Sequence, residues 1–366
     1  MSGPLRIGID ARELLGEVTG VGRYLGELIT RWTSRADAAS RRFILYAPQP
    51  LDLPLQKEST ETRVVPGGTG TWWEQTALRS AVRGDKPHVF FAPAYTAPLF
   101  LGIPFAVTIH DVSFLAHPEW FRPRERWRRR ILANRMAASA SLIFTDSEFS
   151  RSEIASLLHV DANRLKVIPP GVSQVPGTAP ADVSQPRDPL VLFVGTLLNR
   201  RNLPELIAAF AKAATATPAA RLVIVGADRT WPPQDLKQAA AAYDVASRVE
   251  IRSYLPHEQL RGHYSRASVF VFLSEYEGFG LTPLEALAAG VPIVVLDTPI
   301  AREVYGDSAE FVGVGDIDST ANAIARFLES RAAARDQLSR APAVLARYSW
   351  DRAADETLHH LEGIGR

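Results

Sequence analysis

Short apolar stretches alternate with longer segments of helical periodicity along the whole chain. In the first half the expected strands are LRIGID, RFILYA, HVFFAP, FAVTIHD, SLIFTD and LKVIPP, and segments such as VGRYLGELITRW, TWWEQTALRSAV and SEFSRSEIASLL carry the helical period. Several of these strands are apolar at successive positions, which is typical of a parallel sheet covered by helices on both faces. The first half therefore predicts a doubly wound α/β domain.

The same alternation begins again after a break that is rich in proline and glycine. Residues 171–189, GVSQVPGTAPADVSQPRDP, show no periodicity and predict a linker. The strands LVLFVG, RLVIVG, VEIRS, SVFVFLS, VPIVVLD and AEFVG follow it. We expect a first domain over 1–172, a linker over 173–188 and a second doubly wound domain over 189–348. The final amphipathic helix, 349–366, either ends the second domain or crosses back to the first.

The composition fits this architecture and excludes several classes of chemistry. The 366 residues are 46% hydrophobic and 22% charged, as in soluble globular proteins of two ordinary domains. The sequence has no run of 18 apolar residues, so no membrane span is expected. The first strand begins too early to leave room for a signal peptide. We expect a cytoplasmic protein. The chain has no cysteine, which excludes disulfides, thiolate metal sites and a cysteine nucleophile.

One segment is strongly basic. Residues 118–135, PEWFRPRERWRRRILANR, contain seven arginines interleaved with Trp120, Phe121 and Trp127. The arginines do not form one stripe, so a solvated helix face with aromatic anchors is the favoured interpretation. The alternative is a peripheral contact with an anionic membrane at its inner face, or with a phosphorylated acceptor.

In open parallel sheets ligands bind beyond the carboxyl ends of the strands, so the turns that follow the strands hold the candidate site residues. Gly20 and Gly22 follow the first strand and either bring backbone N–H groups to a phosphate or form an ordinary turn. His110 follows FAVTI; it is either a histidine satisfied within the core or a hydrogen-bond donor to a bound sugar or phosphate.

Two adjacent cations stand where a helix is expected to begin. In FVGTLLNRRNLPELIAAF, Asn202 or a neighbour is expected to cap a helix, with Pro204 in its first turn. Arg200 and Arg201 would then stand beside the positive end of the helix dipole, which is unfavourable unless an anion joins them. The pattern predicts a bound phosphate or diphosphate. Another motif, Asp316-Ile317-Asp318, looks like a metal-binding acidic pair, but helix capping is the favoured role.

Residues 274–290, SEYEGFGLTPLEALAAG, place two glutamates across a glycine turn. Thr282 and Glu285 spell a capping box for the helix that follows, which would give Glu285 a structural role. That reading does not explain Glu277 or the Gly278–Gly280 turn, whose backbone N–H groups can point at an anionic ligand. We therefore expect replacement of Glu277 by alanine to leave the melting temperature almost unchanged.

Together, these segments resemble those of the retaining glycosyltransferases of family 4. EGFGLTPLEALAAGVPIVV is similar to their Glu-x7-Glu signature, and VTIHDVSFLAHPEWF, FTDSEFSRSEI, KVIPPGV and FVGTLLNRRNLPELIAAF agree with the family in order. The resemblance covers nearly the whole chain. It implies the GT-B fold, in which two Rossmann-like domains face each other and the second holds most of the nucleotide-sugar donor. It also implies that no metal or other cofactor is needed.

The resemblance assigns roles to individual residues. Glu277 would contact the donor sugar, Glu285 the ribose, and Arg200 and Arg201 the diphosphate, while Gly22, with Gly20 beside it, would approach the phosphates and His110 would lie near the reacting sugar. The remaining positions implied in donor binding surround the base, the sugar and the phosphates: Tyr254, Leu255, Phe279, Gly280, Leu281 and Thr282. The family often has lysine where this chain has Arg201.

The function implied is transfer of a sugar, with retention at the anomeric carbon, from a nucleotide sugar to a glycan or lipid-linked acceptor. The segments around GVGRYLGEL and LLNRRNLPELIAAF look most similar to mannosyl- and rhamnosyltransferases of surface-polysaccharide assembly, so GDP-mannose is the first choice of donor. The alternatives are a sugar-nucleotide epimerase on the same fold and a non-catalytic nucleotide-sugar binder. No nucleic-acid partner is expected.

Overall fold

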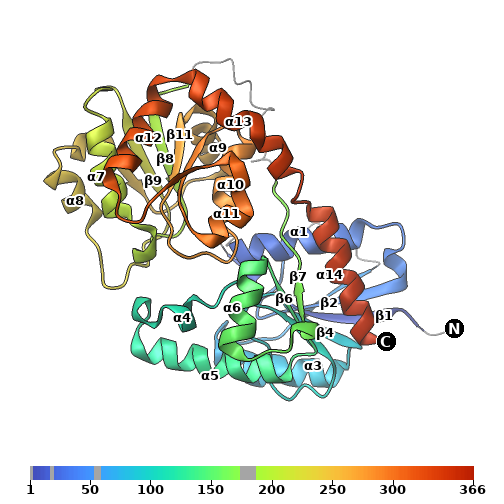
Figure 1. Ribbon diagram of the computed structural model, residues 1–366. Helices are drawn as coiled ribbons and strands as arrows, with labels where there is room; N and C mark the ends of the chain where they lie inside the picture. The colour runs from blue at the N-terminus through green and yellow to red at the C-terminus, as the bar shows by residue number, and fades with distance from the viewer. Residues whose placement is uncertain (1–2, 17–19, 53–58, 174–186) are drawn as a thin grey trace. The chain divides into compact units, whose positions relative to one another are not determined.

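The computed structural model describes residues 3–16, 20–52, 59–173 and 187–366 (Figure 1). The chain divides into two compact units. Unit 1 comprises residues 1–116, 123–171 and 349–366, and unit 2 comprises residues 117–122 and 172–348. Most of the expected linker, residues 174–186, lies outside the described residues.

Unit 1 is built on a parallel sheet whose seven described strands run in the order β3-β2-β1-β4-β5-β6-β7. Their bounds are Leu5–Asp10 (β1), Arg41–Ala47 (β2), Thr60–Val64 (β3), Val89–Ala92 (β4), Phe105–Thr108 (β5), Leu142–Thr145 (β6) and Leu165–Val167 (β7). The apolar pattern predicts all of these except β3. That strand, TETRV, is polar because it is an edge strand that pairs only with β2 and is largely exposed.

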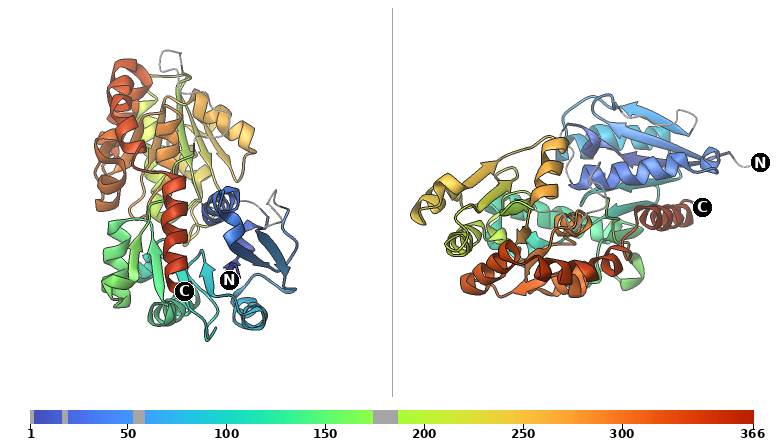
Figure 2. Two further views of the ribbon diagram at one scale, coloured as in Figure 1. Left: turned by 90° about the vertical axis from the view of Figure 1, so that its right-hand side faces the viewer. Right: turned by 90° about the horizontal axis from the view of Figure 1, so that it is seen from above.

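The helices of unit 1 lie on both sides of this sheet (Figures 1 and 2). They are Gly20–Ser34 (α1), Thr71–Trp73 (α2), Arg79–Asp85 (α3), Ser113–Ala116 (α4), Pro123–Ser139 (α5), Glu148–Leu158 (α6) and Trp350–Gly365 (α14). Helix α14 packs against α1, β1 and β4. Of the two alternatives left open by the sequence, the final helix therefore crosses back to the first unit.

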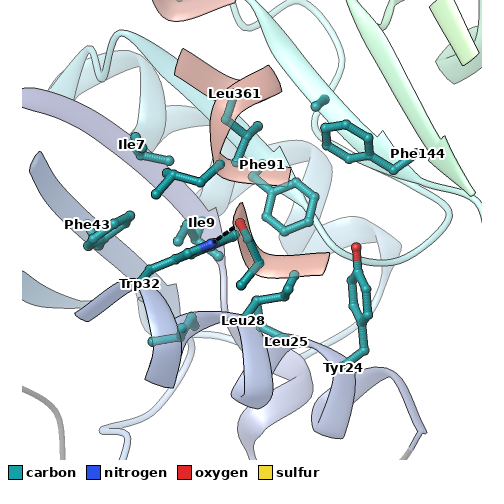
Figure 3. Packing of buried hydrophobic residues seen from close by; sticks show 14 of the residues in the cluster. Ile7, Ile9, Tyr24, Leu25, Leu28, Trp32, Phe43, Phe91, Phe144 and Leu361 are labelled. Carbon is teal, nitrogen blue, oxygen red and sulfur yellow. Dashed lines mark hydrogen bonds between the residues drawn. The ribbon is translucent and has the colours of Figure 1, made fainter. Parts of the chain in front are cut away.

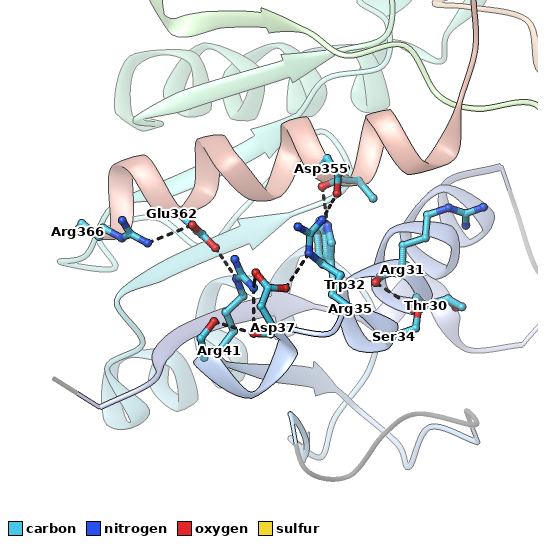
Figure 4. A network of polar contacts seen from close by, with 12 residues as sticks. Thr30, Arg31, Trp32, Ser34, Arg35, Asp37, Arg41, Asp355, Glu362 and Arg366 are labelled. Carbon is cyan, nitrogen blue, oxygen red and sulfur yellow. Dashed lines mark hydrogen bonds and ion pairs between the residues drawn. The ribbon is translucent and has the colours of Figure 1, made fainter. Parts of the chain in front are cut away.

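The core of unit 1 shows why α14 belongs there. The Trp32 ring is fully buried, stacks on Phe43 at 5.7 Å between centroids, and donates its indole N–H to the Ala354 carbonyl at 2.8 Å (Figure 3). At the surface, Arg31 pairs with Asp351 at 2.6 Å. Two more ion pairs hold α14: Arg35, just after α1, pairs with Asp355, and Arg41 of β2 pairs with Glu362 (Figure 4). An apolar face and a flanking row of charges thus fix the helix.

Unit 2 repeats the architecture, with six described parallel strands in the order β10-β9-β8-β11-β12-β13. The strands are Leu190–Val194 (β8), Arg221–Val225 (β9), Val249–Arg252 (β10), Val269–Phe272 (β11), Ile293–Leu296 (β12) and Glu310–Val312 (β13). The helices are Leu203–Ala213 (α7), Leu236–Ala242 (α8), His257–Arg266 (α9), Leu281–Ala288 (α10), Pro299–Tyr305 (α11), Ile317–Glu329 (α12) and Arg331–Leu345 (α13). The α/β class expected for both halves is confirmed.

The strand order marks where a ligand can enter unit 2. The chain runs outward from β8 through β9 to β10 and then returns to pair β11 with the other side of β8. The loops that leave the carboxyl ends of β8 and β11 therefore start from adjacent strands at this reversal point, which is where ligands bind in open parallel sheets. These are the loops that carry Arg200, Arg201 and Glu277.

Candidate active site

The loop after β8 presents its two arginines in a short 3-10 turn, Asn199–Arg201, directly before α7. Asn202 is the N-cap residue of α7, as expected, but it adopts a left-handed conformation with φ of 48° and makes no side-chain cap bond. Its amide instead donates to Glu275 Oε1 at 2.9 Å and to the Leu273 carbonyl at 3.2 Å. This side chain thus joins the loop after β8 to the loop after β11.

Arg201 and Glu277 form an ion pair with 3.0 Å between Nη2 and Oε1, and their side chains are only 11% and 15% exposed. Glu277 Oε1 also accepts the Ser274 hydroxyl at 2.7 Å, and Arg201 Nη1 donates to the Thr196 carbonyl at 2.9 Å. Burial lowers the pKa of the Arg201 guanidinium, and the Glu277 carboxylate opposes that effect. Removal of Glu277 would leave a largely buried cation without its counter-charge, so the structure now favours a lower melting temperature for Glu277→Ala, in contrast to the expectation from the sequence.

Arg200 differs from Arg201 in how many of its guanidinium nitrogens contact other residues. Its Nε donates to the Tyr276 carbonyl at 3.0 Å, and within the described residues its two terminal nitrogens donate to no protein group. The Arg200 carbonyl accepts the Glu275 N–H at 2.9 Å, which fixes the backbone on both sides of the side chain. Arg200 is therefore the arginine whose two terminal nitrogens are left as donors for an anion, whereas the Arg201 Nε, which also lacks a partner among the described residues, is buried.

Helix α10 begins two residues earlier than the sequence predicts. Its N-cap residue is Gly280, at φ 89°, and Thr282 lies inside the first turn with no side-chain cap bond. The Gly280 carbonyl accepts the Tyr305 hydroxyl at 3.0 Å, and a Cβ at Gly280 would lie 2.1 Å from that hydroxyl oxygen. Glycine is thus required both by conformation and by this close approach.

The early start of α10 makes the capping-box interpretation wrong. A capping glutamate must lie three residues after the cap, whereas Glu285 lies five residues after Gly280. The Glu285 side chain is 6% exposed. Capping therefore no longer accounts for this buried glutamate, and its predicted contact with a ribose stays a prediction.

The other positions of the second half that are predicted to bind the donor lie after the carboxyl ends of the strands, on loops or in the first turn of α10. Phe279 is buried and meets Tyr348 edge to face at 5.0 Å, so its ring packs the turn. Leu281 opens α10. Tyr254 and Leu255 follow β10, two strands from β8, and Tyr254 is 54% exposed.

In unit 1, Gly20 and Gly22 lie in the first turn of α1, which begins at Gly20. His110 is largely buried, with Nδ1 2.7 Å from Asp146 Oδ2 and Nε2 3.0 Å from the Pro93 carbonyl. Both partners accept, so the imidazolium form satisfies both. Burial lowers the pKa of His110, but the nearby Asp146 carboxylate outweighs it and the net direction is upward. His110 is thus satisfied within the unit, one of the two alternatives open from the sequence.

Unit 1 also contains a cavity of about 330 Å³ that the sequence did not reveal. Its lining includes a buried charge cluster in which Arg12 binds both carboxylate oxygens of Asp10 and also pairs with Glu74. Burial raises the pKa of Asp10, and Arg12 opposes it. Arg128 and Arg129 of α5 line the same cavity. The only hint in the sequence is a charged pair, Asp10 and Arg12, at the end of an apolar strand.

Helix α5 carries most of the basic segment. Only Ala133, Met136 and Ala137 of this helix are buried, so the favoured interpretation of a solvated face with few anchors holds for its N-terminal half. Trp127 is 69% exposed and does not anchor the helix. None of the helices that the structure describes has the length and apolar character needed to cross a bilayer.

Of the acidic pair at the start of α12, Asp316 has the expected capping role. Asp316 is the N-cap residue and accepts the Ser319 N–H at 2.9 Å and the Ser319 hydroxyl at 2.7 Å. Asp318 pairs with Lys212 at 2.6 Å. Within the described part of the chain, no group of three or more His, Asp or Glu side chains is arranged to hold a metal ion.

Comparison with known proteins agrees with this geometry. Residues 180–343 match the family model of glycosyl transferases group 1, and residues 18–174 match that of glycosyltransferase family 4. The chain is 28% identical over 289 residues to O-antigen chain mannosyltransferase B of Escherichia coli, covering 76% of this chain and 75% of the relative. It is 27% identical over 279 residues to the GDP-mannose:cellobiosyl-diphosphopolyprenol alpha-mannosyltransferase of Xanthomonas oryzae pv. oryzae, covering 75% and 72%.

The fold comparison covers both units. The sucrose-phosphate synthase of Thermosynechococcus elongatus matches with a TM-score of 0.76 and 20% identity over 99% of each chain. The family matches extend over most of unit 1 and most of unit 2, and the structural match extends over nearly the whole chain. The chain therefore belongs to family 4 of the glycosyltransferases and has the GT-B fold.

Proposed function

We propose that this glycosyltransferase transfers mannose from GDP-mannose to a glycan or lipid-linked acceptor, with retention at the anomeric carbon. One observation carries the donor side: Arg200 is anchored at the reversal point of the unit 2 sheet with two terminal nitrogens that donate to no described group. A planar guanidinium with free donors suits a diphosphate. Mannosyl transfer and the guanosine nucleotide are taken from the names of the relatives.

The chemistry requires stabilisation of the leaving diphosphate. As the bond between the sugar and the phosphate breaks, negative charge accumulates on the diphosphate, and Arg200 with the N-termini of α7 and α10 would stabilise it. Because these groups supply positive charge, we propose that turnover needs no divalent metal and no other cofactor.

Glu277 is proposed to bind the donor sugar and not to attack it. Its Oε1 is held by Arg201 and Ser274, whereas Oε2 has no protein partner within the described residues. A carboxylate fixed through one oxygen can accept hydrogen bonds from sugar hydroxyls through the other. With no free carboxylate proposed as a nucleophile, retention would follow a same-face route in which the leaving phosphate accepts the acceptor's proton.

The unit 1 cavity is proposed to receive the acceptor. Its carboxylates and hydroxyls suit a sugar, and its size suits one or two sugar rings. Arg128 and Arg129 at the same cavity could meet a phosphate of a lipid-linked acceptor. Through the remaining exposed arginines of α5, we propose peripheral contact with anionic membranes.

A thermal-shift panel of GDP, UDP, ADP and dTDP tests the donor proposal. A nucleotide that binds only the folded protein stabilises it against unfolding by about 2.7 kcal/mol at a hundredfold excess over Kd. The nucleotide with the correct base should therefore give the largest shift. GDP should raise the melting temperature most, and Arg200→Gln should lose most of that shift while Tyr243→Leu, a change at an exposed aromatic residue of unit 2, should keep it. A larger shift with another nucleotide would overturn the choice of donor.

A further inference from the structure

Six residues of the chain leave unit 1 and pack into unit 2. Residues 117–122 follow α4 and precede α5, both of which belong to unit 1, yet these six residues cluster with unit 2. They include a short 3-10 turn, Pro118–Trp120. Neither the donor loops nor the basic helix accounts for this excursion of the chain.

Two rings of this segment form a stack against the loop after β11. The imidazole of His117 and the indole of Trp120 lie parallel, with 3.9 Å between centroids and an interplanar angle of 12°. Both meet Tyr276 edge to face, at 5.4 Å from His117 and 6.4 Å from Trp120. Tyr276 is buried and immediately precedes Glu277. The stack therefore braces the loop that carries the sugar-binding glutamate.

Trp120 also lies within cation–π distance of Arg200, the residue proposed to bind the diphosphate. The guanidinium carbon of Arg200 lies 5.9 Å from the Trp120 ring centroid, and Arg200 Nε donates to the Tyr276 carbonyl at 3.0 Å. One hydrogen bond and one aromatic face thus restrict the rotation of this long side chain. Both restraints leave the terminal nitrogens of Arg200 available.

The segment has a second anchor on the loop after β9, which is hydrogen-bonded to the arginine loop. Arg122 lies over the Trp231 ring, 4.6 Å from its centroid. The Trp231 N–H donates to Asn199 Oδ1 at 2.6 Å, and the Asn199 amide donates to the Pro232 carbonyl at 2.9 Å. Asn199 directly precedes Arg200, so residues 117–122 are tied to the arginine loop at two places.

We propose that Trp120 is a positioning residue that holds Arg200 ready for the donor diphosphate, and that residues 117–122 form one side of that subsite. The inference rests on the proposed function, because it assigns the diphosphate to Arg200. Ordering a side chain when a ligand binds costs conformational entropy and weakens binding. If Arg200 is already ordered before the ligand arrives, this cost does not reduce the affinity. Its charge is also fixed where charge develops as the glycosyl bond breaks.

This role predicts a selective effect on the diphosphate. In the full-length protein, Trp120→Ala should weaken GDP binding about five- to tenfold and GMP binding far less, because the monophosphate lacks one of the two groups that Arg200 would contact. Pyrophosphate, which carries no base, should be weakened like GDP. The turnover number should fall by a larger factor than KM rises, since the misplaced charge matters most in the transition state.

Three comparisons separate positioning from simple packing. Trp120→Phe keeps an aromatic face and should recover most of the GDP affinity, whereas Trp120→Leu should not. Tyr243→Leu should leave both nucleotides unaffected. In the Arg200→Gln background, Trp120→Ala should cost little further GDP affinity, because the residue through which it acts is already gone.

Several results would overturn the inference. One is an equal loss of GDP and GMP affinity in Trp120→Ala. Another is tighter GDP binding by this variant, as expected if the segment blocks the site. The third is that the losses of GDP affinity in Trp120→Ala and Arg200→Gln add fully in the double variant. Failure of the proposed function is distinguishable. If GDP does not bind the natural protein but pyrophosphate binds in a Trp120-dependent way, the donor is wrong and the inference stands. If the natural protein binds both and Trp120→Ala is unchanged, only the inference fails.

Discussion

The ion pair between Arg201 and Glu277 provides the most quantitative test of the site's construction. Glu277→Gln keeps the size of the side chain and an acceptor for the Ser274 hydroxyl but removes the charge that balances Arg201. Breaking a fully buried pair costs about 3–5 kcal/mol. Because both side chains retain some exposure, at 11% and 15%, we expect about 2–4 kcal/mol here.

This loss should be visible as a lower melting temperature. For a domain of about 150–250 residues, 1 kcal/mol shifts the melting temperature by about 2–4 °C, so a decrease of about 4–16 °C is expected for the transition of unit 2. Calorimetry of the full-length protein resolves this transition if the two units unfold separately, and hydrogen exchange of the β11 amides measures the same loss locally.

A double-mutant cycle separates the pair from other effects of each substitution. Arg201→Met should also destabilise the protein, but the double variant should be less destabilised than the sum of the single variants, with a coupling of about 2 kcal/mol. Turnover of Glu277→Gln should fall strongly while GDP affinity stays within about threefold, because free GDP carries no sugar. If Glu277→Gln melts within about 1 °C of the natural protein, the buried-pair account is refuted.

The remaining predictions address the ribose contact, the metal, the membrane and pH. Glu285→Gln should weaken GDP binding about tenfold, because a hydrogen bond to a charged acceptor contributes about 1.5–3 kcal/mol, and unchanged affinity would remove the ribose assignment. Turnover should persist in EDTA; loss of activity that Mg²⁺ or Mn²⁺ restores would show a metal requirement. Anionic vesicles should co-sediment the protein at low salt and release it as salt rises, whereas neutral vesicles should not bind it; absence of binding at low salt would disprove membrane contact through residues 118–135. The raised pKa of His110 means that its pair with Asp146 stabilises the protein at low pH, and that this contribution is lost as pH rises through the pKa of the folded protein. His110→Gln should therefore lower the melting temperature more at pH 6 than at pH 9, and an effect that grows with pH would contradict the assignment.

The strands of both sheets were predictable because parallel strands buried on both faces must be apolar throughout. The one strand that the pattern misses, β3, lies at an edge where exposure permits polar residues. The apolar pattern still found the half-exposed edge strand β10, where apolar and polar residues alternate, but it missed β3, whose residues are mostly polar. The position of α14 was left open because an amphipathic helix specifies that one face is buried but not against which unit.

The site was predictable in its location and not in its pairing. The turns after β8 and β11 followed from the fold class, and the two arginines stood out because cations beside a helix N-terminus need an anion. The sequence could not show that Glu277 already supplies a carboxylate to Arg201, since the two lie on loops 76 positions apart. The prediction that Thr282 caps α10 failed for a similar reason, because a contact between residues distant in sequence sets the start of the helix. The Tyr305 hydroxyl donates a hydrogen bond to the carbonyl of Gly280, the residue that caps α10.

The cluster of Asp10, Arg12 and Glu74 was missed for the same reason. Asp10 and Arg12 are neighbours in sequence, but Glu74 comes from the helical segment that follows α2, and only the folded sheet brings it near β1. Charged residues at the end of an apolar strand are a weak signal alone. Together with a cavity of about 330 Å³ they become the proposed acceptor site.

The central claim is that the enzyme transfers mannose from GDP-mannose to an acceptor. The most direct measurement incubates the full-length protein with GDP-mannose, with and without a diphosphate-linked lipid saccharide, and follows donor and product by NMR. The account predicts that GDP release requires the acceptor and that the mannosyl product keeps the α configuration of the donor. Conversion of the donor without acceptor would indicate an epimerase, and a β-linked product would contradict transfer with retention.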